Sequence, residues 1–197
     1  MVILIHGGGN IAGYAMSDIS RFRILEKFAG YKIVVFPQSV YLRMPGHPHV
    51  KRCQDAYCCN ENLTIVLRDT QSYNLAKELF SGKTRLLLAP DMAFQIGNVH
   101  RFRSPVFDVM WIKRKDSETP RYEEKDIGKH PADIRVHVSD WWLFKTNSAP
   151  SSLERAFNIA TNGFTYLSRG RVVVSDRLHG HILSTLMNIP HVLIDNR

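Results

Sequence analysis

The sequence lacks any long hydrophobic run. Its apolar segments, such as Val2 to Ile5 and Leu86 to Ala89, are only a few residues long, whereas a membrane-spanning helix needs about 20 apolar residues. The N-terminus also lacks a charged segment followed by a long apolar stretch, so no secretory signal is predicted. The content of 44% hydrophobic and 22% charged residues is typical of a globular protein and excludes a disordered polyelectrolyte.

Cysteine is scarce, with 3 residues among 197. Cys53, Cys58 and Cys59 are odd in number and have no CxxC spacing. This spacing argues against a disulfide framework and against a zinc site. We therefore expect reduced cysteines that pack within a helix.

Acidic residues are fewer than basic ones. The sequence has 18 Asp and Glu and 26 Lys and Arg, so its formal net charge is +8. Excess positive charge can bind nucleic acid, an anionic membrane surface or small anionic substrates. Here the cations are scattered, and the densest group, Lys113 to Lys115, is followed at once by Asp116 and Glu118. A nucleic-acid binder more often shows a basic stripe with interleaved aromatic residues. We therefore expect no nucleic-acid partner.

Short aliphatic runs alternate with helical patterns along the chain, which is typical of βα units and a parallel sheet. Strands are predicted at residues 2–5, 32–36, 64–67, 85–88, 106–112, 134–138, 171–175 and 191–194, and a last helix at 178–188. A linker is predicted at 97–105. The pattern thus indicates an α/β protein of two Rossmann-like lobes, residues 1–100 and residues 101–197.

One further helix is predicted before the strand at 171–175. It is expected to begin with the capping-box pattern Ser151-Ser152-Leu153-Glu154, in which serine and glutamate side chains satisfy free backbone amides. Its expected apolar stripe consists of Leu153, Ala156, Phe157 and Ala160. Asn162-Gly163 is expected to weaken this helix or to end it early.

Glycines follow the first predicted strand, in the segment His6-Gly7-Gly8-Gly9-Asn10. Glycines at this place let the backbone approach a ligand closely, at the sheet edge where α/β proteins bind substrates. The segment is not GxGxxG and has no Lys-Ser/Thr of a phosphate loop, so it specifies neither a dinucleotide nor ATP. A tight turn is the alternative interpretation.

The segment Ser175-Asp176-Arg177-Leu178-His179-Gly180-His181 follows a buried strand and opens a helix. Arg177 and His179 lie on its first turn, where unpaired amides and the helix dipole attract an anion. The planar fork of Arg177 suits phosphate or carboxylate, and Asp176 is expected to cap the helix or to orient a neighbouring cation. The alternative is an ordinary cap with a surface partner.

Arg114 leaves the first strand of the second lobe, whose carboxyl end can lie near that of the strand at 171–175. Arg114 and Arg177 are therefore expected to face one ligand, unless Arg114 belongs to a solvated loop of mixed charge. The pair Trp141-Trp142 suits either sugar stacking or packing in the core.

The chain resembles the polysaccharide pyruvyltransferase family. The family's C-terminal signature is matched by the run from Ser175 to Ser184 and by Asn188-Ile189-Pro190-His191-Val192 through Asp195-Asn196. Further motifs match in the same order, namely Gly7-Gly8-Gly9-Asn10, Phe36-Pro37-Gln38-Ser39, Arg68-Asp69, Pro90-Asp91-Met92-Ala93-Phe94 and Lys113-Arg114-Lys115-Asp116. The similarity covers nearly the whole chain, and the segment Asp176 to His181 is its most specific part.

The resemblance implies a glycosyltransferase-B-like fold and the transfer of pyruvate from phosphoenolpyruvate to a sugar of a glycan, as a cyclic ketal. The phosphoenolpyruvate ligands it implies are Arg114, Arg177, Leu178 and His179, with His179 as the catalytic group. Gly8, Gly9 and Asn10 are expected at the acceptor site or cleft. No metal and no cofactor besides phosphoenolpyruvate as co-substrate is expected, because arginines can compensate the charge.

Family members carry an additional strand and loop before the glycine segment and continue beyond Asp195-Asn196, so the chain is expected to be truncated at both ends. Two other functions stay open: a non-catalytic glycan- or anion-binding remnant, and a nucleotide-sugar glycosyltransferase of the same fold class. The compartment also stays open, since bacterial members are cytoplasmic and eukaryotic ones can be Golgi-lumenal, as do the oligomeric state and the acceptor sugar.

Overall fold

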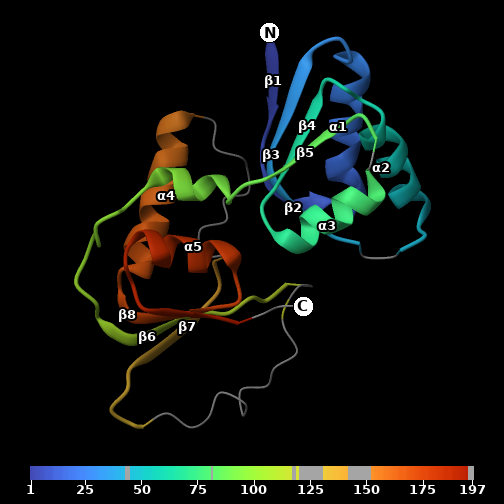
Figure 1. Cartoon of the computed structure of the whole chain (residues 1–197). Helices are drawn as coiled ribbons and strands as arrows, with labels where there is room; N and C mark the ends of the chain where they lie inside the picture. Colours follow the sequence, from blue (N-terminus) through green and yellow to red (C-terminus); the bar gives the residue numbers. More distant parts are fainter. Residues whose placement is uncertain (43–44, 81, 117–118, 120–130, 142–151, 195–197) are drawn as a thin grey trace. The chain divides into compact units, whose positions relative to one another are not determined.

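The computed structural model describes residues 1–42, 45–80, 82–116, 119, 131–141 and 152–194. The chain divides into two compact units, Met1–Met92 and Ala93–Arg197, which Figure 1 colours from blue to green and from green to red. Each unit contains one sheet in which every pairing is parallel. The predicted α/β class with parallel sheets is confirmed.

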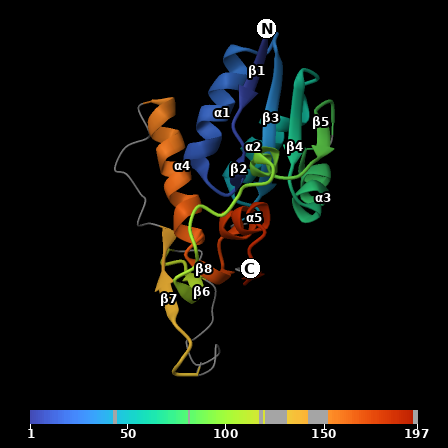
Figure 2. The same ribbon diagram turned by 90° about the vertical axis from the view of Figure 1, so that its left-hand side faces the viewer.

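The first unit is built on the sheet order β1-β3-β4-β5, with β2 also paired to β3. Figure 2 shows β1 at one edge of this sheet and β5 at the other. The strands are β1 (Val2–Ile5), β2 (Gly8–Ile11), β3 (Lys32–Val40), β4 (Leu63–Leu67) and β5 (Arg85–Leu88). Strand β3 is longer than predicted because it pairs with β1 along its first half and with β2 along its second. The alternative interpretation of the glycine segment as a tight turn is wrong, since Gly8–Ile11 is a strand.

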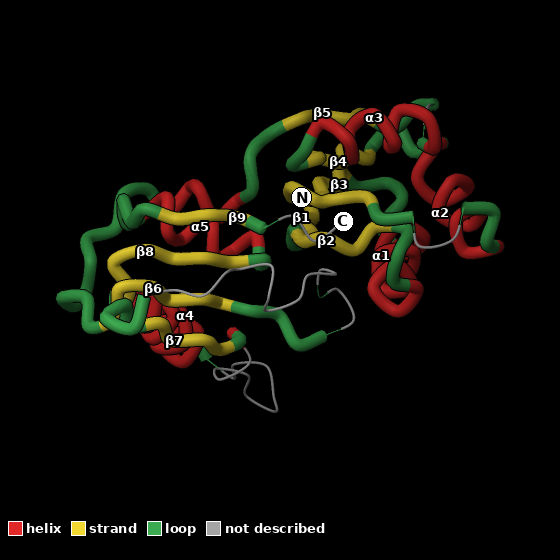
Figure 3. Tube along the Cα trace, turned by 90° about the horizontal axis from the view of Figure 1, so that it is seen from below, coloured by secondary structure: helices red, strands yellow, loops and turns green. Residues whose placement is uncertain are grey.

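Three helices of the first unit lie on one side of its sheet (Figure 3). They are α1 (Ala15–Lys27), α2 (Pro48–Cys58) and α3 (Thr70–Leu79). The 3₁₀ helix η1 (Met92–Ile96) follows β5 at the boundary between the two units. Successive crossovers advance in one direction from β1 to β5, and right-handed crossovers then place every helix on the same face. Helix α2 begins with Pro48 in its first turn. Helix α3 is capped by Asp69, whose carboxylate accepts a hydrogen bond from the Ser72 amide at 2.7 Å.

The core of the first unit lies between its sheet and these helices. Fully buried side chains include Phe22 of α1, Tyr57 of α2 and Ile33, Leu63 and Ile65 of the sheet. Of the cysteines, all free, Cys53 is buried as expected, whereas Cys59 is exposed at the end of α2. Burial therefore follows the helix face and not the residue type.

The second unit is built on the sheet order β7-β6-β8-β9. The strands are β6 (Phe107–Ile112), β7 (Val136–Ser139), β8 (Gly170–Ser175) and β9 (His191–Leu193), and the helices are α4 (Leu153–Leu167) and α5 (Leu178–Leu186), which contact each other. Helix α5 ends earlier than predicted, and Asn188 behind it has a positive φ of 51°, which asparagine tolerates better than most residues. In the part of the chain that the structure describes, no helix has the length and apolarity to cross a membrane.

Helix α4 differs from its prediction in three ways. It runs through Asn162-Gly163 to Leu167, and Gly163 is buried within it, so the Asn-Gly pair does not end the helix. Its cap is Ser152, which accepts from the Arg155 amide at 3.2 Å, while Ser151 lies outside the described residues. The predicted apolar stripe is not buried, because Leu153 is 74% and Phe157 is 64% exposed.

Candidate functional site

The candidate anion site lies in the second unit, where strands β6 and β8 end side by side. Ile112 pairs with Ser175, so Arg114 and Asp176 follow the ends of adjacent strands. The Arg114 amide donates to both carboxylate oxygens of Asp176, at 2.9 and 3.0 Å, and Asp176 is 2% exposed. Asp176 does not cap α5 as one expectation had it; it fixes the backbone that carries Arg114.

Arg114 and Arg177, which were expected to face one ligand, both bind the carboxylate of Asp116. Arg114 donates to Asp116 through Nε at 2.9 Å and through Nη2 at 3.1 Å. Arg177, at the start of α5, donates to the same carboxylate through Nη2 at 3.0 Å. The two guanidinium groups therefore converge on a single carboxylate within this unit.

A second carboxylate, Asp140, holds Arg177 from the end of β7. Arg177 donates to it through Nε at 2.8 Å and Nη2 at 3.0 Å, and Asp140 also accepts from the Lys115 and Trp141 amides. Burial alone would lower the pKa of Arg177, but hydrogen bonds and the charges of Asp140 and Asp116 raise it above its usual value. The arginine therefore stays charged and fixed in direction.

The remaining residues of the predicted donor site lie on the first turn of α5. Leu178 and His179 are its first two residues, and both are exposed. Gly180 is buried beneath them, where a Cβ would collide with Ser175 Oγ. This close approach lets α5 start directly at the end of β8, so His179 stands near the strand ends that carry the arginines.

The predicted glycine segment lies in the first unit, among other polar motif residues. A Cβ on Gly9 would lie 2.7 Å from Arg68 Nη2, and Arg68 donates to Ser39 Oγ at 2.9 Å and to Asp91 at 2.7 Å. Asn10 accepts a hydrogen bond from Arg21. Four segments quoted for the family resemblance therefore meet at the carboxyl edge of this sheet.

One buried polar atom at this edge has no hydrogen-bond partner among the described residues. Gln38 is fully buried and donates through Nε2 to the His6 carbonyl at 2.8 Å, while its Oε1 accepts no hydrogen bond from any described residue. A Cβ on Gly8 would lie 3.7 Å from that oxygen, which places the amide beside the glycine strand.

Sequence reasoning assigned no role to three residues that contact side chains of the segment Asp176 to His181. Asp140 and Asp116 were given no role. Asp116 lies in the motif Lys113-Arg114-Lys115-Asp116, which could have drawn attention to it, whereas Asp140 carries no local signal. The meeting of both with Arg177 depends on the order of β7, β6 and β8. His191 also forms a pair with His181, with Nε2 and Nδ1 2.8 Å apart. Of the two tryptophans, Trp141 packs against the core of the unit, and Trp142 lies outside the described residues.

The fold and the site define an α/β protein whose polar side chains gather at the carboxyl ends of parallel strands. The profile of the family Polysaccharide pyruvyl transferase matches residues 1–197, and the chain belongs to this family. It is 32% identical over 206 residues to "Pyruvyl transferase 1" of Schizosaccharomyces pombe, covering 98% of this chain and 51% of that protein. It is 28% identical over 214 residues to "Putative pyruvyl transferase EpsO" of Bacillus subtilis, covering 100% and 66%.

A solved structure is similar as well. The crystal structure of a functionally uncharacterized Klebsiella pneumoniae protein superposes with a TM-score of 0.54 at 19% identity, over 94% of this chain and 62% of that one. At this identity the likeness shows the fold alone. The chain spans about half to two thirds of the length of these relatives, so their whole activity is not carried over to it.

Proposed function

We propose that this chain binds phosphoenolpyruvate in its second unit and transfers pyruvate to a sugar of a glycan as a cyclic ketal. The observation that carries the proposal is the convergence of Arg114 and Arg177 on one carboxylate. A guanidinium fork that holds a side-chain carboxylate in two-point contact suits the carboxylate of a donor equally well. Leu178 and His179 complete the proposed donor site.

The donor is proposed to take the place of Asp116. With Asp116, Asp140 and Asp176 beside Arg114 and Arg177, the charges of these five groups sum to −1, from two cations and three carboxylates. A trianion has no net attraction to such a group. If the donor displaces Asp116 from both arginines, their charge faces the ligand, while Asp140 still orients Arg177.

The proposed reaction needs acid and base catalysis. A proton adds to the methylene carbon of phosphoenolpyruvate, and one sugar hydroxyl attacks the adjacent carbon, which bears the phosphate. Phosphate then leaves, and a second sugar hydroxyl attacks the same carbon and closes the ketal. The two sugar hydroxyls release two protons. One replaces the proton that was added to the methylene carbon, and the other protonates the released phosphate. His179 is the proposed general acid and base, because imidazole exchanges protons near neutral pH.

The acceptor is proposed to be a saccharide whose contacts include Gly8, Gly9 and Asn10. We also propose that the two units are the lobes of a glycosyltransferase-B-like fold. Support comes from the parallel α/β character of both units and from the motif residues at the carboxyl edge of the first sheet.

The test measures donor binding and turnover separately. Calorimetry with phosphoenolpyruvate is combined with phosphate release and detection of the ketal on a panel of galactosyl and mannosaminyl acceptors. We expect Arg177→Ala to abolish binding and His179→Ala to abolish turnover, while Arg171→Ala, at the opposite end of β8, changes neither. Turnover retained in both variants would refute the proposal.

Two other outcomes point elsewhere. Saccharide or phosphate binding without turnover identifies the non-catalytic remnant. A rise in melting temperature with a nucleotide-sugar, and none with phosphoenolpyruvate, identifies a glycosyltransferase, since a ligand that binds only the native state raises its stability.

A further inference from the structure

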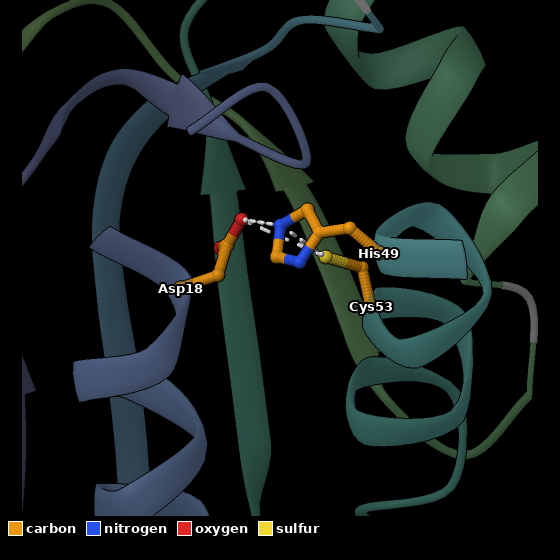
Figure 4. A group of neighbouring side chains, drawn as sticks. All are labelled: Asp18, His49 and Cys53. Carbon is orange, nitrogen blue, oxygen red and sulfur yellow. Dashed lines mark hydrogen bonds and ion pairs between the residues drawn. The ribbon is translucent and has the colours of Figure 1, made fainter. Parts of the chain in front are cut away.

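A cluster of three potential metal ligands lies in the first unit, separate from the donor site. Figure 4 shows Asp18 of α1 pointing toward His49 and Cys53 of α2. Asp18 and Cys53 are fully buried, and the His49 side chain is 12% exposed. His49 and Cys53 are four residues apart and therefore share one face of α2.

The three donor atoms already have the separations of a metal coordination sphere. His49 Nε2 lies 2.9 Å from Asp18 Oδ2 and 3.5 Å from Cys53 Sγ, and Sγ lies 3.6 Å from Asp18 Oδ2. A tetrahedral zinc ion, about 2.0 Å from nitrogen or oxygen and about 2.3 Å from sulfur, places N and O about 3.3 Å apart and S about 3.5 Å from either. The three observed distances between the donor atoms differ from those of such a tetrahedral site by only a few tenths of an ångström.

The surroundings of Asp18 match those of a metal-binding carboxylate. Its Oδ1 accepts from Tyr57 Oη and Arg21 Nη1, each at 2.7 Å, and its Oδ2 accepts from the Ala12 amide at 2.9 Å. Ligating carboxylates are usually fixed by such outer hydrogen bonds. The oxygen that faces His49 and Cys53 is the one that Arg21 does not contact.

The charge of Arg21 is offset by Asp18. The two side chains form a buried ion pair through Asp18 Oδ1 at 2.7 Å, while Oδ2 lies 2.9 Å from His49 Nε2 and 3.6 Å from Cys53 Sγ. The carboxylate is therefore paired with the guanidinium through one oxygen and offers the other to a cation.

We propose that Asp18 Oδ2, His49 Nε2 and Cys53 Sγ bind a divalent cation of the zinc class, with a fourth position left for water. Binding releases the thiol proton to solvent and moves the Nε2 proton of His49, now hydrogen-bonded to Asp18, to Nδ1 or to solvent. Metal–thiolate and metal–imidazole bonds form in their place, so no oxidant or reductant is involved. The ion ties α1 to α2. Through the Asp18–Arg21 and Arg21–Asn10 contacts it also steadies the glycine strand β2.

The test is a titration of the purified chain, first stripped with a chelator, using cobalt(II) and then zinc by competition. We expect one equivalent to bind and to produce the thiolate-to-cobalt charge-transfer absorption and the visible bands of tetrahedral cobalt. Cys53→Ser and His49→Gln should each weaken binding by at least about 100-fold, since the loss of an outer hydrogen-bond partner alone costs about 10- to 100-fold. Cys59→Ser, the matched exposed control, should bind like the parent chain.

Folding is checked separately, because Cys53 is buried. Cys53→Ala keeps the site apolar, and both cysteine variants should retain the circular dichroism of the metal-free parent. No binding by the folded parent would overturn the proposal. So would binding that survives Cys53→Ser but disappears when Cys58 and Cys59 are replaced together, since that identifies a site at the exposed thiols. None of these outcomes depends on phosphoenolpyruvate binding.

Discussion

Replacing Asp116 by asparagine tests whether this carboxylate occupies the place of the donor. The variant keeps the shape of the side chain and removes its charge, so Arg114 and Arg177 lose an anionic partner while Asp140 still holds Arg177. The charge of the five groups changes from −1 to zero. We therefore expect Asp116→Asn to bind phosphoenolpyruvate more tightly than the parent chain.

The expected magnitude follows from the two ion pairs that the donor must replace. The side chains of Arg114, Arg177 and Asp116 are 13%, 16% and 22% exposed, so each pair is only partly screened. At about 1 kcal/mol per pair, the upper end for exposed pairs, displacement costs about 2 kcal/mol. This corresponds to roughly 30-fold in the dissociation constant, because about 1.4 kcal/mol equals a factor of ten.

The assay is calorimetric titration with phosphoenolpyruvate at constant ionic strength. Asp108→Asn is the matched control, since Asp108 pairs with surface arginines at the opposite end of β6 and its loss should leave the dissociation constant unchanged. An unchanged or larger dissociation constant for Asp116→Asn would refute the idea of displacement. It would mean that Asp116 positions the arginines instead of occupying their ligand site.

Three further predictions concern stability. Gly170→Ala places a Cβ 2.6 Å from Met110 Cβ and should lower the free energy of unfolding by about 1–3 kcal/mol. Gly30 has open space around it, so Gly30→Ala should change the free energy of unfolding by less than about 0.5 kcal/mol. Urea denaturation of both variants measures the difference. Tyr57→Phe removes a hydrogen bond to buried Asp18 and should cost about 1–2 kcal/mol in the same experiment; an unchanged midpoint would contradict it. Burial and the charge of His191 lower the pKa of His181 below 6.5, so the unfolded chain binds a proton that the native state does not. Stability should therefore fall as pH drops below about 6.5, and His181→Asn should flatten that dependence in melting curves recorded across this range.

The sequence predicted those strands whose pattern is local. The runs at 2–5 and 85–88 coincide with β1 and β5, because short aliphatic stretches bounded by polar residues favour a strand. Both are edge strands with several exposed side chains, so the aliphatic pattern identified the strands but not their burial. Strand β2 could not be predicted, since glycines have little intrinsic preference for strands. It forms because β3 extends past the end of β1 and offers free pairing groups to Gly8–Ile11.

Helix α4 shows the opposite case. Its periodic apolar stripe was a valid signal for a helix, and the helix is present, but Leu153 and Phe157 stay exposed while Phe164 and Leu167 are buried. Periodicity identifies a helix and a candidate face, but only the position of α4 on its sheet decides which turns of the helix reach the core.

The sequence by itself determined the family and the α/β class. It also encodes the chemical character of the proposed donor site, because an arginine and a histidine on the first turn after a buried strand lie within ten residues of each other and of that strand. The tertiary structure alone decided the partners of those residues. The strand order β7-β6-β8 brings Asp140, Asp116 and Arg177 together from three segments, and the packing of α1 on α2 brings Asp18 to His49 and Cys53. Such meetings depend on long-range pairing, which local residue preferences do not encode.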